Sequence, residues 1–275
     1  MNGQGTRVVV PGVGTPLTSS GRSVAYLPPP WRMRGRALAF WFRVRDPDEI
    51  RRHVPPTVAV DKDPIVRARF WDLEHDAAGP AVGEPGERRW TSFREAVVAF
   101  PIVRDGVTGD LPVHMYADDF SYTAMGREVM GWPVRDGRIE VDAEPADGPH
   151  AGLVIGARMT REGRPVMEAS ITLEGVPALE ESPPPPIWLA EKVIPHVDRP
   201  GALVAQLVAT GPERIDRRHV WTATGSVSFG PSPSDELDRL APREIVRVEY
   251  WSGMTLTVGW GRVVAELGEG VYDPR

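Results

Sequence analysis

The chain has 275 residues, of which 41% are hydrophobic and 25% are charged, so it can bury a sizeable core in one or two domains. A net charge of −6 argues against a nucleic-acid-binding protein, and no stretch approaches the roughly 18 apolar residues of a membrane helix. The lack of cysteine excludes disulfides and thiolate chemistry. The N-terminal residues do not show the charged region followed by an apolar region that is typical of a secretory signal peptide, so we expect a cytoplasmic protein.

In chain order, the sequence pattern predicts many short strands and few helices. A β-rich run at 37–45 precedes a helix that should begin after Asp46, a good N-cap followed by Pro47, and should stop at Pro55. A second short helix is expected at 234–240. Alternating or apolar runs predict the other strands, with a hairpin turn at 161–164: 65–71, 95–103, 152–160, 165–173, 220–229, 244–250 and 254–264.

The segment 126–135, called the signature segment below, reads GREVMGWPVR. It resembles the signature of the acetoacetate decarboxylase superfamily, in which Gly-Arg-Glu is followed by an aromatic-Pro pair and then by two lysines. In lysine-bearing members the first lysine forms a Schiff base with the substrate, and a neighbouring cation activates it. Here Val134 and Arg135 stand in the positions of the two lysines. The segment therefore indicates the family and lacks its Schiff-base nucleophile.

Other landmarks of that family follow in order over nearly the whole chain. They are Thr15 to Ser19, Arg36, 47–55, 61–69, Phe93-Arg94-Glu95, 109–118, 192–195 and 242–246.

The resemblance implies an α+β fold with mostly antiparallel strands, a β-barrel or cone with a few peripheral helices, and assembly into a homo-oligomer. A Ser-Pro-Pro-Pro-Pro segment at 182–186 could divide two domains. Because it lies inside the region of resemblance, we interpret it as a crossing within one domain that spans 1–275. The segment 77–89, rich in Gly, Pro and charge, is expected to be a surface loop.

Only two of the 32 basic residues are lysines, Lys62 and Lys192. A preference for arginine codons accounts for this bias. Arginine stays protonated and cannot act as an amine nucleophile. Both lysines are far from the signature segment in sequence, so we expect no lysine amine in the pocket.

Two candidate catalytic residues precede the signature segment. Glu95 begins an apolar strand, so it is either a desolvated general acid/base or a solvated glutamate paired with Arg94. Arg36 is either a carboxylate-binding fork or a surface arginine in a basic cluster. In both cases the resemblance favours a catalytic role.

Three further arginines are candidates for substrate binding. Arg69 stands where the resemblance places a second carboxylate, or else it belongs to the solvent face of an alternating strand. Arg135 and Arg127 come from the signature segment, together with Glu128, a third candidate catalytic residue that could instead form an exposed pair with Arg127. The resulting pocket would be net cationic, which favours a carboxylate substrate.

Trp132, Val134, Met115 and Tyr116 are expected to form an apolar pocket wall, although such clusters are often plain core. The six histidines show no metal-ligand spacing, so we expect neither a metal nor a cofactor.

These expectations combine into one hypothesis. The chain is a lyase or isomerase of specialised metabolism that acts on a small oxo acid or related carbonyl compound. Its chemistry would be dehydration, cyclisation, tautomerisation or decarboxylation without a Schiff base. Arg36, Glu95 and Arg135 should converge on one cavity with Val134 on its wall. The alternative is a catalytically inactive ligand-binding or regulatory paralogue.

Overall fold

The computed structural model describes residues 26, 29–55, 58–60, 63–76, 90–104, 107–175, 187–232 and 234–267. Four features of the sequence lie outside these residues: the landmark at 15–19, Lys62, the expected loop 77–89 and the polyproline segment 182–186.

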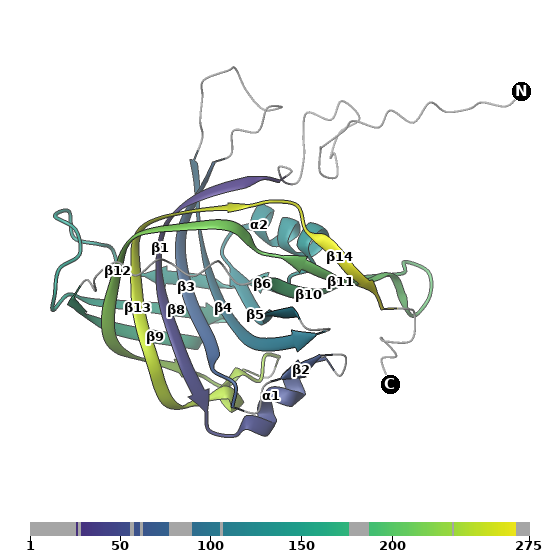
Figure 1. Cartoon of the computed structure of the whole chain (residues 1–275), viewed down its shortest axis with the longest axis horizontal. Coiled ribbons are helices and arrows are strands. Elements are labelled where there is room, and N and C mark those ends of the chain that lie inside the picture. Colours follow the sequence, from purple (N-terminus) through teal and green to yellow (C-terminus); the bar gives the residue numbers. More distant parts are fainter. Residues whose placement is uncertain are drawn as a thin grey trace, which may run out of the picture.

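The described strands form one curved, fourteen-stranded sheet, which confirms the prediction of a mostly antiparallel β protein (Figure 1). Its order is β14-β11-β10-β5-β4-β3-β1-β13-β12-β9-β8-β7, while β2 pairs with β4 and β6 with β5. Among the strands that the structure describes, only the pairings of β5 with β6 and β10 are parallel. The strands are β1 (Trp31–Val44), β2 (Ala59–Val60), β3 (Val66–Asp76), β4 (Trp90–Arg104), β5 (Val107–Ala117), β6 (Val134–Asp136), β7 (Arg138–Val141), β8 (Val154–Arg161), β9 (Arg164–Gly175), β10 (Trp188–Pro195), β11 (Ala202–Thr210), β12 (Pro212–Phe229), β13 (Pro242–Val258) and β14 (Arg262–Glu266).

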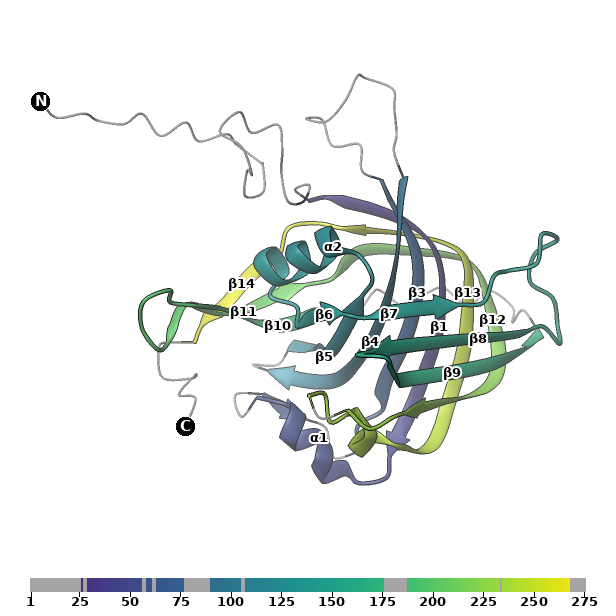
Figure 2. The same ribbon diagram turned by 180° about the vertical axis from the view of Figure 1, so that it is seen from behind.

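The helical elements are short. They are α1 (Pro47–His53), α2 (Phe120–Met125), a π-helical turn η1 (Gly126–Met130) and a 3₁₀ turn η2 (Leu237–Leu240). Figure 2 shows α1 and α2 at opposite ends of the curved sheet. None of the helices in the described part of the chain has the length and apolar character needed to cross a membrane.

The start of α1 follows the sequence prediction. The side chain of Asp46 accepts a hydrogen bond of 3.0 Å from the backbone N–H of Asp48, and Pro47 is the first helical residue. The helix ends at His53, two residues before Pro55, because a residue next to a proline is driven out of the α region.

The hairpin of β8 and β9 is also confirmed. Its turn uses Glu162 and Gly163, both with positive φ, as a two-residue turn between twisted strands requires. The prediction of two separate strands at 244–250 and 254–264 was wrong. β13 continues through Gly253 as one 17-residue strand, since β1 and β12 pair with it on both sides of that glycine.

Side chains alternate between the two faces of the sheet, and each face buries its own core. The larger core lies where β7, β8 and β9 cross in front of β1 and β3, and it includes Phe40, Phe70, Tyr116 and Ile155 (Figure 2). The second core, called the tryptophan-rich core below, contains Trp31, Trp71, Trp132, Trp188 and Trp251 together with Met115 and Val134. The candidate site belongs to this second core.

Candidate functional site

The signature segment makes a tight excursion between α2 and β6. Asp119 caps α2 by accepting a hydrogen bond of 2.7 Å from the N–H of Tyr122. η1 then ends at Gly131, whose φ is +70°. A Cβ at Gly131 would lie only 2.7 Å from the Cα of Lys192 on β10, so glycine is required both for the left-handed backbone and for the close approach. This excursion returns the chain to the sheet at Val134.

Glu95 lies inside the protein, with 2% of its surface exposed. The hydroxyl of Tyr122 donates a short hydrogen bond to its Oε2, while Oε1 has no hydrogen-bonding partner within the described residues. Burial raises the pKa of Glu95 to about 7, although the hydrogen bond from Tyr122 and the charge of Arg69 favour the ionised form. A carboxyl group with this pKa can both accept and donate a proton near neutral pH.

Arg69 lies on the neighbouring strand β3, and its charge acts on this carboxyl. Arg69 pairs with Val97, which makes Arg69 and Glu95 diagonal neighbours about 7–8 Å apart in the backbone. Its guanidinium lies 5.7–6.0 Å from the ring centroids of Trp41, Trp71 and Trp251. Burial, aided by the nearby charges of other arginines, lowers the pKa of Arg69 to about 9. Its Nε has no hydrogen-bonding partner among the residues that the structure describes.

The sheet register connects the signature segment to this arginine. Val134 pairs with Met115, Met115 with Val97, and Val97 with Arg69, so all four share one row on the same face. Val134 is fully buried, and its Cγ2 lies 2.7 Å from where a Cβ at Gly126 would be. We call Arg69, Glu95 and Tyr122 the buried site; Val134 and Met115 lie beside it.

Trp132 also lines a pocket of about 910 Å³, which we call the β10 pocket. The ring of Trp132 lies 6.3 Å, between centroids, from the ring of Tyr122, which bonds to Glu95. Glu128 lines the pocket and accepts a hydrogen bond of 2.9 Å from the hydroxyl of Tyr26. Arg127 also lines it and donates to the carbonyl of Val134 over 3.3 Å. Other lining residues are Phe120, Arg135, Glu191, Val193 and Ile194.

The expected convergence of Arg36, Glu95 and Arg135 was wrong. Arg36 pairs with Asp72 across β1 and β3, whereas Glu95 shares the opposite face with Trp71. The Arg36 guanidinium forms an ion pair of 2.7 Å with Asp72. Side chains one residue out of step in a sheet point to opposite faces, and this separates the two groups.

Arg135 and Tyr116 are displaced from the buried site for the same reason. They pair with each other in register, one residue along from Val134 and Met115. Tyr116 belongs to the larger core, so its expected place in the same wall as Met115 was wrong. The guanidinium of Arg135 bonds to the buried carboxylate of Asp235. Arg135 is thus tied to the far side of the sheet, although it borders the β10 pocket.

Lys192 lies against the signature segment, so its distance in sequence was a poor guide to its position. Its Nζ lies 3.4 Å from the carbonyl oxygen of Val129, and its backbone packs on Gly131. Burial lowers the pKa of Lys192, whereas the charge of Glu128 acts to raise it. It is not among the residues that line the β10 pocket.

Several residues of this region were not predicted as site residues. Trp71 follows Arg69 by two in an alternating run, so periodicity could have placed it on the same face. Nothing in the sequence linked Tyr122 to Glu95. Glu249 is buried beside Trp251, whose indole N–H donates to it over 2.7 Å, and it also bonds to Arg247.

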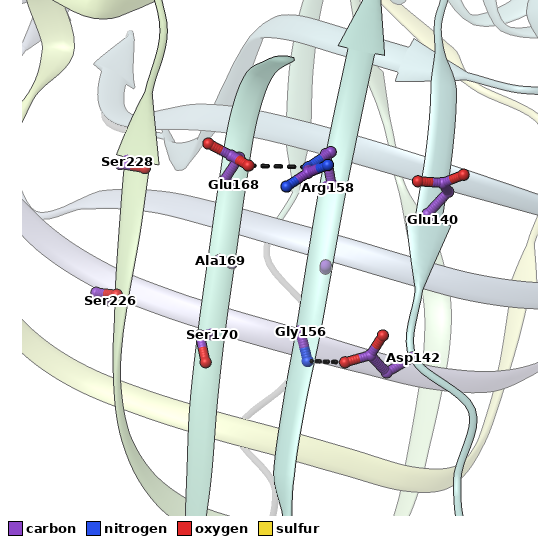
Figure 3. A pocket seen from close by; sticks show the side chains of 10 residues that line it. Glu140, Asp142, Gly156, Arg158, Glu168, Ala169, Ser170, Ser226 and Ser228 are labelled. Atoms are coloured by element: carbon purple, nitrogen blue, oxygen red, sulfur yellow. Dashed lines mark hydrogen bonds and ion pairs between the residues drawn. The ribbon is translucent and has the colours of Figure 1, made fainter.

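The second pocket, of about 440 Å³, is a weaker candidate. It lies over β7, β8, β9 and β12, where Arg158 and Glu168 form an exposed ion pair and Asp142 accepts from the N–H of Gly156 (Figure 3). Exposed ion pairs of this kind contribute little to stability. Among the described residues, no group of three or more His, Asp or Glu side chains could hold a metal ion.

The chain resembles known proteins over most of its length. Residues 14–267 match the family model described as "Acetoacetate decarboxylase (ADC)". Acetoacetate decarboxylase from Paraburkholderia xenovorans is 26% identical over 247 residues, covering 87% of this chain and 88% of that protein.

Two solved structures share the fold. The enduracididine biosynthesis enzyme MppR, complexed with the condensation product of pyruvate and imidazole 4-carboxaldehyde, has a TM-score of 0.78 at 23% identity, covering 94% of this chain and 97% of that one. Acetoacetate decarboxylase from Legionella pneumophila has a TM-score of 0.73 at 22% identity, covering 88% and 90%.

Proposed function

Because this chain belongs to the acetoacetate decarboxylase family, we propose that it is a lyase or isomerase that acts on a small oxo acid or related carbonyl compound without forming a Schiff base. The observation that carries the proposal is the buried site. It combines a carboxyl group with a pKa of about 7 and a buried guanidinium whose Nε has no partner within the described residues. The structure of one relative, the enzyme MppR complexed with pyruvate, supports an oxo acid as the ligand class.

In this proposal the substrate carboxylate or enolate oxygen binds Arg69. The pKa of Arg69, lowered to about 9, keeps the guanidinium protonated at neutral pH. Glu95 removes a proton from the carbon next to the carbonyl, and Arg69 stabilises the resulting enolate in a low-dielectric site. The proton then returns to another carbon or to a leaving hydroxyl, which gives tautomerisation or dehydration. Tyr122 holds the carboxylate in place through its hydrogen bond.

The β10 pocket supplies the approach. Trp132 lines it on one side and faces Tyr122 on the other, so a shift of these two rings would join the pocket to Glu95. Glu128 and Arg127 at the pocket wall then contact an incoming substrate before it reaches the buried site.

The test uses 2-oxobutyrate in D₂O, with exchange of the C3 protons followed by NMR. Exchange is expected with the wild-type protein and with Lys192→Met, because neither lysine takes part. Borohydride added during turnover should leave the intact mass of the protein unchanged. Loss of exchange in Lys192→Met, together with a stoichiometric adduct mapped to Lys192 or Lys62, would contradict the non-Schiff-base mechanism. No exchange with any of a panel of oxo acids would favour the inactive paralogue.

Restoring the lysine alone is not expected to restore rapid decarboxylation. Val134→Lys would place an ammonium in a fully buried position, on the row that contains Arg69. The charged form of a buried lysine near another cation is destabilised. The new lysine would also lack the contacts that orient its amine toward a substrate. We expect less than about 1 turnover of acetoacetate per second, a tenth of an ordinary enzyme rate of ~10 per second. Val134→Met, of similar length and uncharged, is the matched control for folding, and a faster rate in the lysine variant contradicts the prediction.

A further inference from the structure

A second arginine, half-buried and without an ion pair among the described residues, lies next to the buried site. Arg217 on β12 places its guanidinium carbon 4.8 Å from the ring centroid of Trp251, the same ring that lies 5.7 Å from the guanidinium carbon of Arg69. The charge of Arg217 acts to lower the pKa of Arg69, so the two cations repel each other. The Nε of Arg217 is buried and, like that of Arg69, has no hydrogen-bonding partner in the described part of the chain.

Apart from Glu95, the buried carboxylates among the described residues form ion pairs with other arginines. Glu249, whose charge acts to raise the pKa of Arg217, accepts from the indole N–H of Trp251 at 2.7 Å and bonds to Arg247. The other buried pairs are Asp110 with Arg67 and Asp235 with Arg135 and Arg161. Arg69 and Arg217 are therefore left with aromatic faces and long-range attraction in place of ion pairs among the described residues.

A third unpaired donor belongs to the same cluster. The indole Nε1 of Trp71 is buried without a partner in the described residues, and the Trp71 ring lies 5.5 Å from that of Trp251. Buried donors without acceptors cost free energy in the empty protein, and a bound anion removes that cost. One carboxylate can satisfy one planar guanidinium in a bidentate contact. The guanidiniums of Arg69 and Arg217, which both lie against the Trp251 ring, can therefore bind two anionic groups.

We propose that the substrate is a dicarboxylic oxo acid, with the reacting end on Arg69 and the distal carboxylate on Arg217. The proposal rests on the proposed function for the identity of the reacting end. It adds the distal subsite formed by Arg217, Trp71 and Trp251, which selects against a substrate that ends in a methyl group. In the sheet order, Arg217 on β12 and Glu95 on β4 lie on opposite sides of Trp251 on β13. Because Arg217 is this far from the proton-transfer residue, we assign it a role in binding.

The test compares 2-oxoglutarate with 2-oxopentanoate, which has the same number of carbons and a methyl group in place of the distal carboxylate. Isothermal titration calorimetry on the wild-type protein should give a Kd for 2-oxoglutarate at least about tenfold lower. Arg217→Gln should remove this preference, leaving the two Kd values within about twofold, with the Kd for 2-oxopentanoate unchanged. Arg217→Lys, which keeps the charge, should retain part of it. Arg214→Gln, an exposed position on the same strand, is the matched control.

Each outcome bears on the distal subsite separately from the acid–base chemistry, because binding needs no turnover. Equal or weaker binding of 2-oxoglutarate by the wild-type protein overturns the inference, as does binding of neither acid. An equal loss of both affinities in Arg217→Gln, with no retention in Arg217→Lys, assigns Arg217 to the fold and also overturns it. A tenfold preference in a protein that exchanges no C3 protons supports the subsite and contradicts the proposed catalytic function.

Discussion

Replacing Glu95 with glutamine is expected to lower kcat by about two to four orders of magnitude, the usual contribution of a positioned general acid/base. The amide has nearly the same shape as the carboxyl group but cannot carry a proton in the reaction. Tyr122 can still donate its hydrogen bond to the amide oxygen, so the packing around Phe93 and Trp132 should hold. Substrate affinity should therefore change by no more than about threefold.

The pH profile makes this prediction sharper. Because the pKa of Glu95 is raised to about 7, the base form predominates above that pH, and kcat/KM should rise through pH 7 and then fall as Arg69 loses its proton near its lowered pKa of about 9. The hydrogen bond from Tyr122 favours the ionised carboxylate. Tyr122→Phe removes that bond, so the inflection should move to higher pH.

Steady-state kinetics between pH 5 and 9 would measure both effects, together with calorimetric binding of an unreactive substrate analogue. Glu140→Gln is the matched control, since Glu140 is exposed on β7 and lies in the pocket of Figure 3. A Glu95→Gln protein with more than about a tenth of wild-type kcat contradicts the role of this carboxyl. An inflection that stays in place in Tyr122→Phe contradicts the coupling between the two residues.

Replacing Asp235 with alanine is expected to lower the free energy of unfolding by about 3 kcal/mol. The carboxylate is buried and accepts hydrogen bonds from Arg135, from Arg161 at 2.9 Å and from Ser232 at 2.6 Å. Removing one partner of a buried ion pair costs about 3–5 kcal/mol, because the remaining charge stays uncompensated. The two arginine side chains are 33% and 19% exposed and can turn partly to water, which places the value at the low end.

Urea denaturation at pH 7 measures this loss, and Asp238→Ala on the exposed side of η2 is its control, with an expected change within about 0.5 kcal/mol. The pH dependence has a definite sign. Burial acts to raise the pKa of Asp235, but the hydrogen bond from Ser232, the nearby hydroxyl of Tyr116 and the charges of both arginines hold it below its usual value. The carboxylate therefore adds stability above its unfolded pKa, and this contribution is lost as the pH falls through the folded value. A variant as stable as wild type would show that the ion pairs contribute nothing net.

The strand pattern and the family motif could be predicted because they depend on local sequence. Alternation identified β3 and the interior of β4, the cap at Asp46 identified α1, and a two-residue turn identified the β8–β9 hairpin. Parts of the sheet with weaker alternation, including β10 and β11, were not predicted. Their apolar runs do not show on their own which neighbouring strand will cover them.

The sequence by itself determined that the chain carries valine in the position of the family's Schiff-base lysine, and that an acidic group in an apolar strand lies near several arginines. The tertiary structure decided which of these groups meet. The register aligns Ala37 with Trp71 and Trp71 with Glu95, so Arg36, one residue earlier, points to the other face. Pairings between distant strands likewise brought Lys192 against Gly131 and Arg217 onto Trp251. In a β-strand, local sequence shows which residues share a face, because side chains alternate. Which side chains of other strands they contact depends on the long-range register, which local sequence does not encode.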